Sequence, residues 1–246
     1  MARAHTHSST KSKYKVVLVD DHPILREGFA QIINQEPDLQ VCGQAGTASQ
    51  ALSKIAALKP DLVIVDISLD GTNGIELIKH IKAIHPGLHI LSLSVHDETL
   101  YAQRALRAGA KGYVMKQAST EEVMVAIRRV VRGEQYLSRR MHERMLDTLS
   151  GRSAARIDPS LELPRLSDRQ LEIFQLIGEG RGTRQIALQL HLSIKTVETH
   201  RAHIKEKLKL RSGLELIRHA VEMAGRFTHS AAEREDLRPA EPAVTL

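Results

Sequence analysis

The stretch LVIVD at residues 62–66 decides the fold, because four consecutive apolar residues end on the carboxylate of Asp66. KVVLV at residues 15–19 has the same form and runs directly into Asp20 and Asp21. Near-continuous apolar runs of this length are typical of strands buried on both faces of a parallel sheet. Carboxylates directly after such strands are expected at the carboxyl edge of the sheet, where α/β proteins bind their ligands.

These two runs belong to a repeating pattern of strands and helices. HILSLS at 89–94 and GYVM at 112–115 are further apolar runs, and a weaker one lies at Gln40–Gln44. Helical periodicity separates and follows them, at Pro23–Gln35, Ala48–Leu58, Gly74–His85, Glu98–Ala108 and Thr120–Arg132. Five β-α repeats predict an α/β domain at residues 14–136, with a doubly wound, five-stranded parallel sheet of order 2-1-3-4-5 and right-handed crossovers.

A different pattern begins after an irregular segment. Residues 137–164 are predicted to be a linker with a polar helix at Ser138–Ser150, because GRSAARIDPSLELP contains Gly, Ser and two prolines without periodicity. Residues 165–226 predict an all-α domain, which begins with a capping box formed by Ser167 and Gln170. Its expected helices are Asp168–Gly178, Arg184–Leu190, Lys195–Lys209 and Gly213–Met223. Residues 1–13 and 227–246 are expected to be a disordered leader and tail.

Composition narrows the class of protein. No apolar run approaches the ~20 residues that a membrane span requires, and the N-terminus lacks the apolar core of a secretory signal. We therefore expect a cytoplasmic protein without a membrane partner. Cys42 is the single cysteine, which excludes an internal disulfide and a Cys-rich zinc site.

Charge is distributed unevenly along the chain. Residues 165–226 carry 12 basic and seven acidic residues, whereas residues 14–136 carry 13 and 14. The excess of positive charge favours a phosphate-binding surface in the C-terminal domain. A solvated charged surface without a partner fits the charge equally well.

Polar residues stand at the ends of the predicted strands. Asp20 and Asp21 follow the first, Asp66 ends the third, and Ser94 and Lys116 close the fourth and fifth. In the predicted strand order these ends converge on one pocket. Three neighbouring carboxylates repel each other, and Mg²⁺ relieves that repulsion because it takes oxygen ligands. A metal-held carboxylate can act as a nucleophile toward a phosphoryl group, while the hydroxyl and the ammonium contact the phosphate oxygens.

The same residues carry a family resemblance. LVDDHPILREG, VDISLDGTNGIELIK, LSVHDE and ALRAGAKGYVMK resemble a receiver domain over residues 14–136. The resemblance implies that Asp66 is the phosphoacceptor. It implies direct Mg²⁺ ligation by Asp21 and Asp66, with Asp20 acting partly through water and the backbone carbonyl of Ser68 completing the protein ligands.

The resemblance also implies a set of switch residues, which are Ser94, Lys116 and Tyr113. One position departs from the family pattern. Receiver domains often have proline four residues after the acceptor, where this chain has Asp70. We expect a more flexible loop or an altered metal affinity there, with activity retained.

The C-terminal domain has the spacing of a helix-turn-helix. Val197, Ile204 and Leu208 recur at intervals of seven and four and predict the buried stripe of the second helix. The N-terminal residues of such a recognition helix read base edges in the major groove. The pattern alone is also consistent with a helix-turn-helix that does not bind DNA.

LSDRQLEIFQLIGEGRGTRQIALQLHLSIKTVETHRAHIKEKLKLRS resembles the LuxR-type domain, and both domains together resemble the NarL/FixJ response regulators. The resemblance implies a sensor histidine kinase and double-stranded promoter DNA as partners, with RNA polymerase as a further one. It also implies a homodimer formed through Gly213–Met223. The implied DNA contacts are Thr183, Arg184, Gln185, Lys195, Thr196, Glu198, Thr199, His200, Arg201, Ala202 and Lys205.

The main hypothesis is a transcription factor controlled by phosphorylation, with only slow autodephosphorylation as its own chemistry. A second hypothesis is an enzyme, a Mg²⁺-dependent phosphatase that uses Asp66 as its nucleophile. Residues 67–93 leave no insertion for the substrate cap that such an enzyme needs. A third hypothesis is a receiver that signals through protein contact, with the helix-turn-helix used only for packing. Salt-dependent, sequence-specific DNA binding would separate the first hypothesis from the third.

Overall fold

The computed structural model describes residues 13–69, 72–149, 163 and 165–232. The chain divides into two compact units, Met1–Ser153 and Ala154–Leu246. The predictions for the leader up to residue 12, for Asp70, for linker residues 150–162 and for tail residues 233–246 lie outside the described residues.

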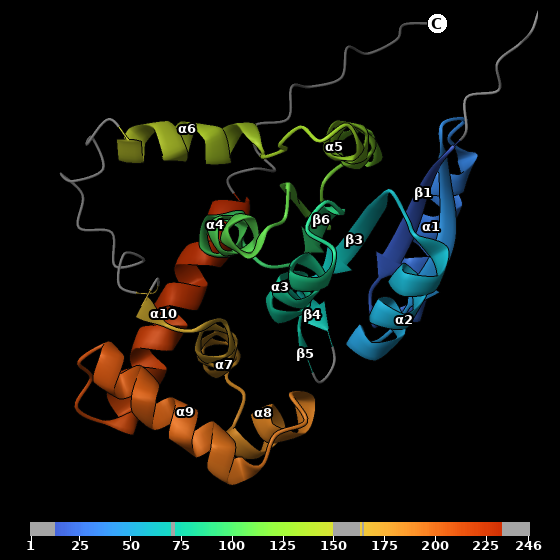
Figure 1. Ribbon diagram of the computed structural model, residues 1–246. Coiled ribbons are helices and arrows are strands. Elements are labelled where there is room, and N and C mark those ends of the chain that lie inside the picture. Colours follow the sequence, from blue (N-terminus) through green and yellow to red (C-terminus); the bar gives the residue numbers. More distant parts are fainter. Residues whose placement is uncertain (1–12, 70–71, 150–162, 164, 233–246) are drawn as a thin grey trace, which may run out of the picture. The chain divides into compact units, whose positions relative to one another are not determined.

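The first unit is built on a five-stranded parallel sheet (Figure 1). Its strands, in the order of the sheet, are β2 (Leu39–Ala45), β1 (Tyr14–Val19), β3 (Leu62–Asp66), β6 (His89–Ser94) and β7 (Gly112–Met115). Each neighbouring pair is parallel. Counted along the main sheet, this order confirms the predicted 2-1-3-4-5 arrangement. The order reverses between β1 and β3, so the carboxyl ends of these two strands adjoin the switch point at which α/β folds bind ligands.

Helices cover both faces of the sheet. They are α1 (Pro23–Gln35), α2 (Ala48–Leu58), α3 (Gly74–Ile84), α4 (Glu98–Ala108) and α5 (Thr120–Val131). Val16, Leu18 and Ile64 point to one face and share a core with residues of α1 and α5. Val17 and Val63 alternate with them and are equally buried, as expected for strands covered on both sides.

A short hairpin next to Asp66 was not predicted from the sequence. It consists of β4 (Ser68–Leu69) paired antiparallel with β5 (Thr72–Asn73). Two residues per strand are too few for a periodic pattern to reveal. Because β4 begins two residues after Asp66, the hairpin fixes the path of the chain that leaves Asp66.

The first unit continues past the sheet. Tyr136 forms an isolated parallel bridge with Gly112 on β7, and the amide of Tyr113 donates to the Tyr136 carbonyl at 3.2 Å. Helix α6 (Arg139–Leu149) follows and packs against α4. The polar helix expected in the linker is therefore present.

The second unit is helical in the residues described. Its helices are α7 (Asp168–Gly178), α8 (Thr183–Gln189), α9 (Ile194–Lys207) and α10 (Gly213–Ala232). The predicted capping box of Ser167 and Gln170 opens α7. A Cβ atom at Gly178 would lie 2.6 Å from the Ala220 carbonyl oxygen, so glycine allows α7 and α10 to pack closely.

The structure corrects the predicted end of the last helix. Helix α10 does not stop at Met223 but continues to Ala232, so residues 227–232 are helical rather than part of a disordered tail. Gly225 resembles a helix-ending residue, since glycine is common just past helix ends. The next proline does not occur until Pro239, so every residue from Arg226 to Ala232 keeps the amide that a helical hydrogen bond needs.

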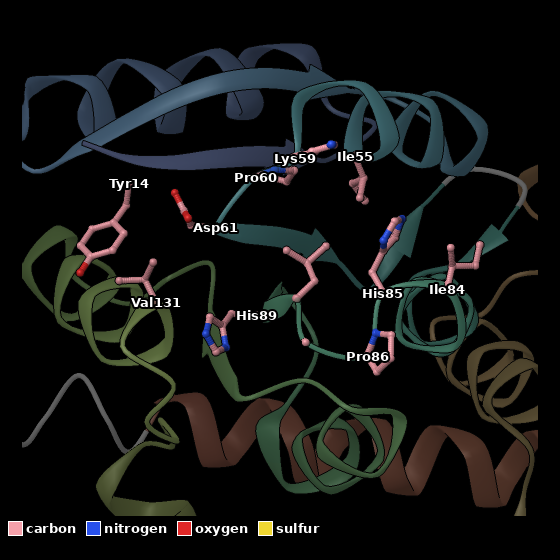
Figure 2. A pocket seen from close by; sticks show the side chains of 12 residues that line it. Tyr14, Ile55, Lys59, Pro60, Asp61, Ile84, His85, Pro86, His89 and Val131 are labelled. Atoms are coloured by element: carbon pink, nitrogen blue, oxygen red, sulfur yellow. The ribbon is translucent and has the colours of Figure 1, made fainter. Parts of the chain in front are cut away.

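A cavity of about 560 Å³ lies at the amino ends of the strands (Figure 2). Its wall includes Tyr14 at the start of β1, Asp61 just before β3 and His89 at the start of β6. The carboxylates predicted to form the site lie at the opposite ends of these strands. Among the residues that the structure describes, no helix is both long and apolar enough to cross a membrane.

Candidate functional site

Four side chains gather at the carboxyl ends of β1 and β3. Asp20 and Asp66 are buried, with exposed fractions of 5% and 1%. Asp21 and His22 lie beside them, and one potential ligand atom from each of the four residues lies within 4.8 Å of the others. Parallel pairing of β1 with β3 brings these residues together although more than 40 positions separate Asp20 from Asp66.

Lys116 joins the two buried carboxylates. Its Nζ atom lies 2.6 Å from Asp20 Oδ2 and 2.7 Å from Asp66 Oδ2, and its side chain is only 6% exposed. Burial raises the pKa of Asp66 to about 6, although the neighbouring ammonium of Lys116 lowers it. For Lys116, burial alone would lower the pKa, but the two carboxylates more than compensate and raise it. Lys116 thus carries one positive charge in a pocket with a surplus of carboxylates.

This donor set fits Mg²⁺. Asp20, Asp21 and Asp66 offer carboxylate oxygens, which are the ligands that Mg²⁺ prefers. His22 lies against the carboxylates, with its Nδ1 atom hydrogen-bonded to Asp20 Oδ1 at 3.3 Å and 2.7 Å from Asp21 Oδ1. A dication would relieve the repulsion among carboxylates that Lys116 balances only in part.

The backbone around Asp66 depends on a glycine that the sequence analysis did not assign to the site. A Cβ atom at Gly74 would lie 2.0 Å from the carbonyl oxygen of Asp66, so no larger residue fits without moving the end of β3. Asn73 caps helix α3 by accepting from the Ile75 amide at 2.9 Å. On the other side, the Ser68 amide donates to Asp66 Oδ1 at 3.1 Å.

Of the predicted switch residues, Ser94 lies on β6, Tyr113 lies on β7, and Lys116 directly follows β7; β6 pairs with β3. Ser94 is fully buried at the end of β6, and its carbonyl accepts from the Lys116 amide at 2.8 Å. Tyr113 is 1% exposed, and its hydroxyl donates to the carbonyl of His96 at 2.8 Å. Burial raises the pKa of Tyr113 above its ordinary value, which keeps its hydroxyl a donor. His96 was not predicted from the sequence to belong to the site, because a single histidine in a loop forms no periodic pattern.

A second candidate surface lies on α9 in the other unit. Val197 and Ile204 are fully buried and Leu208, just past the helix, is nearly so, as the periodicity predicted. The opposite side presents Lys195, Glu198, Thr199 and Ala202 to solvent, and Arg184 and Gln185 are exposed at the start of α8. Thr183, Thr196, His200, Arg201 and Lys205 are partly buried.

Several of these candidates have structural roles as well. Thr196 Oγ1 lies 2.8 Å from the hydroxyl of Ser193, the N-cap of α9. Gln185 caps α8 by accepting from the Gly182 amide at 2.9 Å. The Nδ1 atom of His200 is buried, and burial lowers the pKa of this residue. Of the predicted DNA contacts on α9, the exposed ones are therefore Lys195, Glu198, Thr199 and Ala202.

Comparison with protein families gives two matches on this chain. Residues 16–128 match the family described as "Response regulator receiver domain". Residues 164–220 match the family described as "Bacterial regulatory proteins, luxR family". The first match contains the carboxylate cluster and Lys116, and the second contains α8 and α9.

Individual relatives match both units together. "Oxygen regulatory protein NreC" of Staphylococcus haemolyticus is 35% identical over 209 residues, which cover 84% of this chain and 96% of the relative. The protein of the same name from Staphylococcus carnosus is 36% identical over 211 residues, which again cover 84% of this chain and 96% of the relative. Among solved structures, RcsB of Salmonella enterica serovar Typhimurium, bound to a promoter with the phosphomimetic BeF3⁻, has a TM-score of 0.60 and 25% identity. That likeness covers 85% of this chain and 98% of RcsB.

Proposed function

The chain belongs to the NarL/FixJ-type two-component response regulators, which control DNA binding and transcription, and within this role we propose that Asp66 is the phosphoacceptor. One observation carries the proposal. Asp66 is a buried carboxylate at the end of β3, and the ammonium of Lys116 joins it to a second buried carboxylate, that of Asp20. The members of this family are DNA-binding regulators and not classical enzymes.

The chemistry follows from this placement. A carboxylate oxygen of Asp66 attacks the phosphorus of a phosphohistidine on the sensor kinase, the P–N bond breaks, and its electron pair leaves with the imidazole. The ammonium of Lys116, 2.7 Å from Asp66 Oδ2, lies where it can stabilise charge on the transferred phosphoryl oxygens. The Ser94 hydroxyl is proposed as a second donor to that group. Water attack on the acyl phosphate slowly restores the carboxylate.

Asp66→Asn tests the assignment. Incubation of the full-length protein with a small phosphodonor and Mg²⁺ should add one hydroxylamine-labile phosphate to the wild type and none to the variant, because the nucleophilic oxygen is gone. Asp61→Asn, which removes an exposed carboxylate at the other end of β3, is the matched control and should be labelled normally. Equal labelling of Asp66→Asn would refute the assignment.

We propose that Asp20, Asp21, Asp66 and the Ser68 carbonyl hold Mg²⁺, which supplies charge neutralisation at the phosphoryl oxygens. Asp21→Ala should weaken Mg²⁺ binding at least tenfold in a direct titration and slow phosphorylation, because one carboxylate ligand is lost. Its stability without metal should be equal to or above that of the wild type, since a carboxylate repulsion is removed. Unchanged affinity for Mg²⁺ would contradict the ligand set.

We propose that α9 is the recognition helix for double-stranded DNA. Lys195→Ala should weaken binding without loss of stability, and Arg201→Ala should weaken binding with a small loss of stability because it also removes a partly buried stem. Loss of a base contact should cost ~1–3 kcal/mol. Loss of a phosphate contact should instead weaken all sequences alike and reduce the salt slope by roughly one unit. Fluorescence anisotropy with specific and unrelated DNA over a range of salt distinguishes these results, with Lys79→Ala of the first unit as control. Unchanged binding in both variants would exclude α9.

Dimerisation through α10 is part of the proposal. Leu214, Ile217 and Val221 follow one another at intervals of three and four, and all are substantially exposed, Leu214 at 77%. Such a stripe matches the face that a second copy would cover. RNA polymerase remains a further proposed partner, and the cytoplasm is the proposed compartment because the protein must reach both the kinase and DNA.

A further inference from the structure

The exposed side of α9 carries one acidic residue among the proposed DNA contacts. Glu198 is exposed and follows Lys195 by about one turn of the helix. Its carboxylate forms no hydrogen bond or ion pair with the residues that the structure describes. DNA phosphates repel a carboxylate, so a glutamate at this place weakens binding unless it meets a hydrogen-bond donor of the DNA. Glu198 is therefore suited to base edges and not to phosphates.

The nearest basic neighbour on the helix does not neutralise Glu198. Burial lowers the pKa of Arg201, and the charge of Glu198 opposes that shift, so the two side chains interact electrostatically. They are three residues apart on one helix, and pairs of this kind at a surface are weak. The carboxylate of Glu198 thus stays available to a stronger partner.

The major groove of DNA offers a carboxylate few partners. Its hydrogen-bond donors are the N4 amino group of cytosine and the N6 amino group of adenine. In adenine the acceptor N7 lies beside the amino group and repels a carboxylate, whereas cytosine presents its amino group without an acceptor on the same base. A glutamate at the floor of the groove therefore favours cytosine.

Two methyl groups accompany Glu198 on the exposed side of α9. Thr199 is exposed, and its hydroxyl donates to the Lys195 carbonyl at 2.9 Å, so its methyl group is left for a ligand. Ala202 is exposed and has only a methyl group to offer. Methyl groups of threonine and alanine fit against the C5-methyl group of thymine. From Glu198 to Ala202 the helix rises ~6 Å, which corresponds to about two base-pair steps.

We propose that Glu198 selects a cytosine in the major groove, with the methyl groups of Thr199 and Ala202 against thymine within about two base-pair steps of it. The proposal rests on α9 being the recognition helix. Lys195 and Arg201 then supply affinity for DNA in general. Glu198 supplies discrimination, because its charge is unfavourable wherever the groove presents no donor.

Selection of bound duplexes from a random-sequence pool tests the choice of cytosine. Full-length protein is used with Mg²⁺ and BeF3⁻, and the bound DNA is sequenced. At one cytosine of the selected half-site, Glu198→Ala should lose the preference, and Glu198→Gln should shift it to adenine, since an amide pairs with N6 and N7 of that base. Glu179→Ala removes an exposed glutamate just past α7 and should select the wild-type half-site.

Removal of single groups from the selected DNA tests each contact. Replacing the cytosine with 2-pyrimidinone deletes its amino group and should weaken wild-type binding about tenfold and Glu198→Ala binding less than twofold. Replacing the nearby thymine with uracil deletes its methyl group and should weaken wild-type binding about fourfold. Thr199→Ser keeps the hydroxyl that bonds the Lys195 carbonyl but lacks the methyl group, so it should respond less to uracil.

Several outcomes would overturn the proposal. A half-site without cytosine, no selected half-site at all, or a cytosine that Glu198→Ala still prefers would each refute the role of Glu198. Equal sensitivity of the wild type and Glu198→Ala to 2-pyrimidinone would refute it as well. Equal sensitivity of the wild type and Thr199→Ser to uracil would refute the methyl contact. Failure of the recognition helix itself would appear separately, as unchanged DNA binding by both Lys195→Ala and Arg201→Ala.

Discussion

Two ion clusters in the first unit have the same charges in opposite surroundings. In each, one cation lies between two carboxylates: Lys116, Asp20 and Asp66 form the buried cluster, and Arg128, Asp38 and Glu36 form the exposed cluster. The Lys116 side chain is 6% exposed, whereas that of Arg128 is 31% exposed. Burial is therefore the main difference between them.

The pKa values of the carboxyls move in opposite directions in the two clusters. Burial raises the pKa of Asp66 to about 6 despite the ammonium beside it. The hydrogen bonds from Arg128 lower the pKa of Asp38, because solvent still reaches that carboxylate. The carboxylate of Asp38 is therefore stable in its ionised form without a further cation. Its hydrogen bonds with Arg128 join α5 to the residue before β2. In the buried cluster, a bound cation or a transferred phosphoryl group can change which groups pair with Lys116. A phosphoacceptor site needs this property.

Lys116→Met should have the largest effect, because it removes the cation and keeps most of the aliphatic stem. Loss of one partner from a buried ion pair leaves uncompensated charge and should lower the free energy of unfolding by ~3 kcal/mol. Urea denaturation in the presence of a chelator measures this loss. Added Mg²⁺ should recover more stability in the variant than in the wild type, since the metal replaces the missing charge.

The matched substitution at the exposed cluster is Arg128→Met, and Lys79→Met, which removes an exposed lysine paired with Glu76 on the same helix, completes the set. If Lys116→Met and Arg128→Met lower stability equally in chelator, burial does not separate the clusters. If Mg²⁺ stabilises the wild type and Lys116→Met alike, the metal and the ammonium do not share the carboxylates.

The sequence predicted the elements of the buried cluster because strand ends are encoded locally. Apolar runs ending at Asp20, Asp66, Ser94 and Lys116 give each position, and the alternation of strands and helices gives the order of the sheet. Convergence on one pocket then follows from topology. The buried stripe of α9 was predicted equally well, since its spacing of seven and four is a property of a single helix.

The features that the sequence did not reveal depend on contacts between distant segments. Gly74 is required only because the carbonyl of Asp66 lies against it. His96 belongs to the site because it contacts Ser68 and Tyr101. No pattern in the sequence predicts either contact. Helix α10 continues through Gly225 to Ala232, although glycine is common just past helix ends. The glycine alone therefore predicted the wrong end of this helix.

Arg128→Met should have the smallest effect and tests the exposed side of the comparison. Arg128 donates two hydrogen bonds of 2.9 Å to Asp38, but both side chains are about a third exposed. Solvent screening should limit the loss of stability at pH 7 to ~1 kcal/mol or less. Because the folded pKa of Asp38 is lowered, its contribution is present above the unfolded pKa of about 4 and disappears as the pH falls through the folded value. Urea denaturation at pH 7, 4 and 3 should therefore show a difference between wild type and variant that is retained at pH 4 and reduced at pH 3. A difference as large at pH 3 as at pH 7 would show that Arg128 acts through packing of its stem and not through the charge of Asp38.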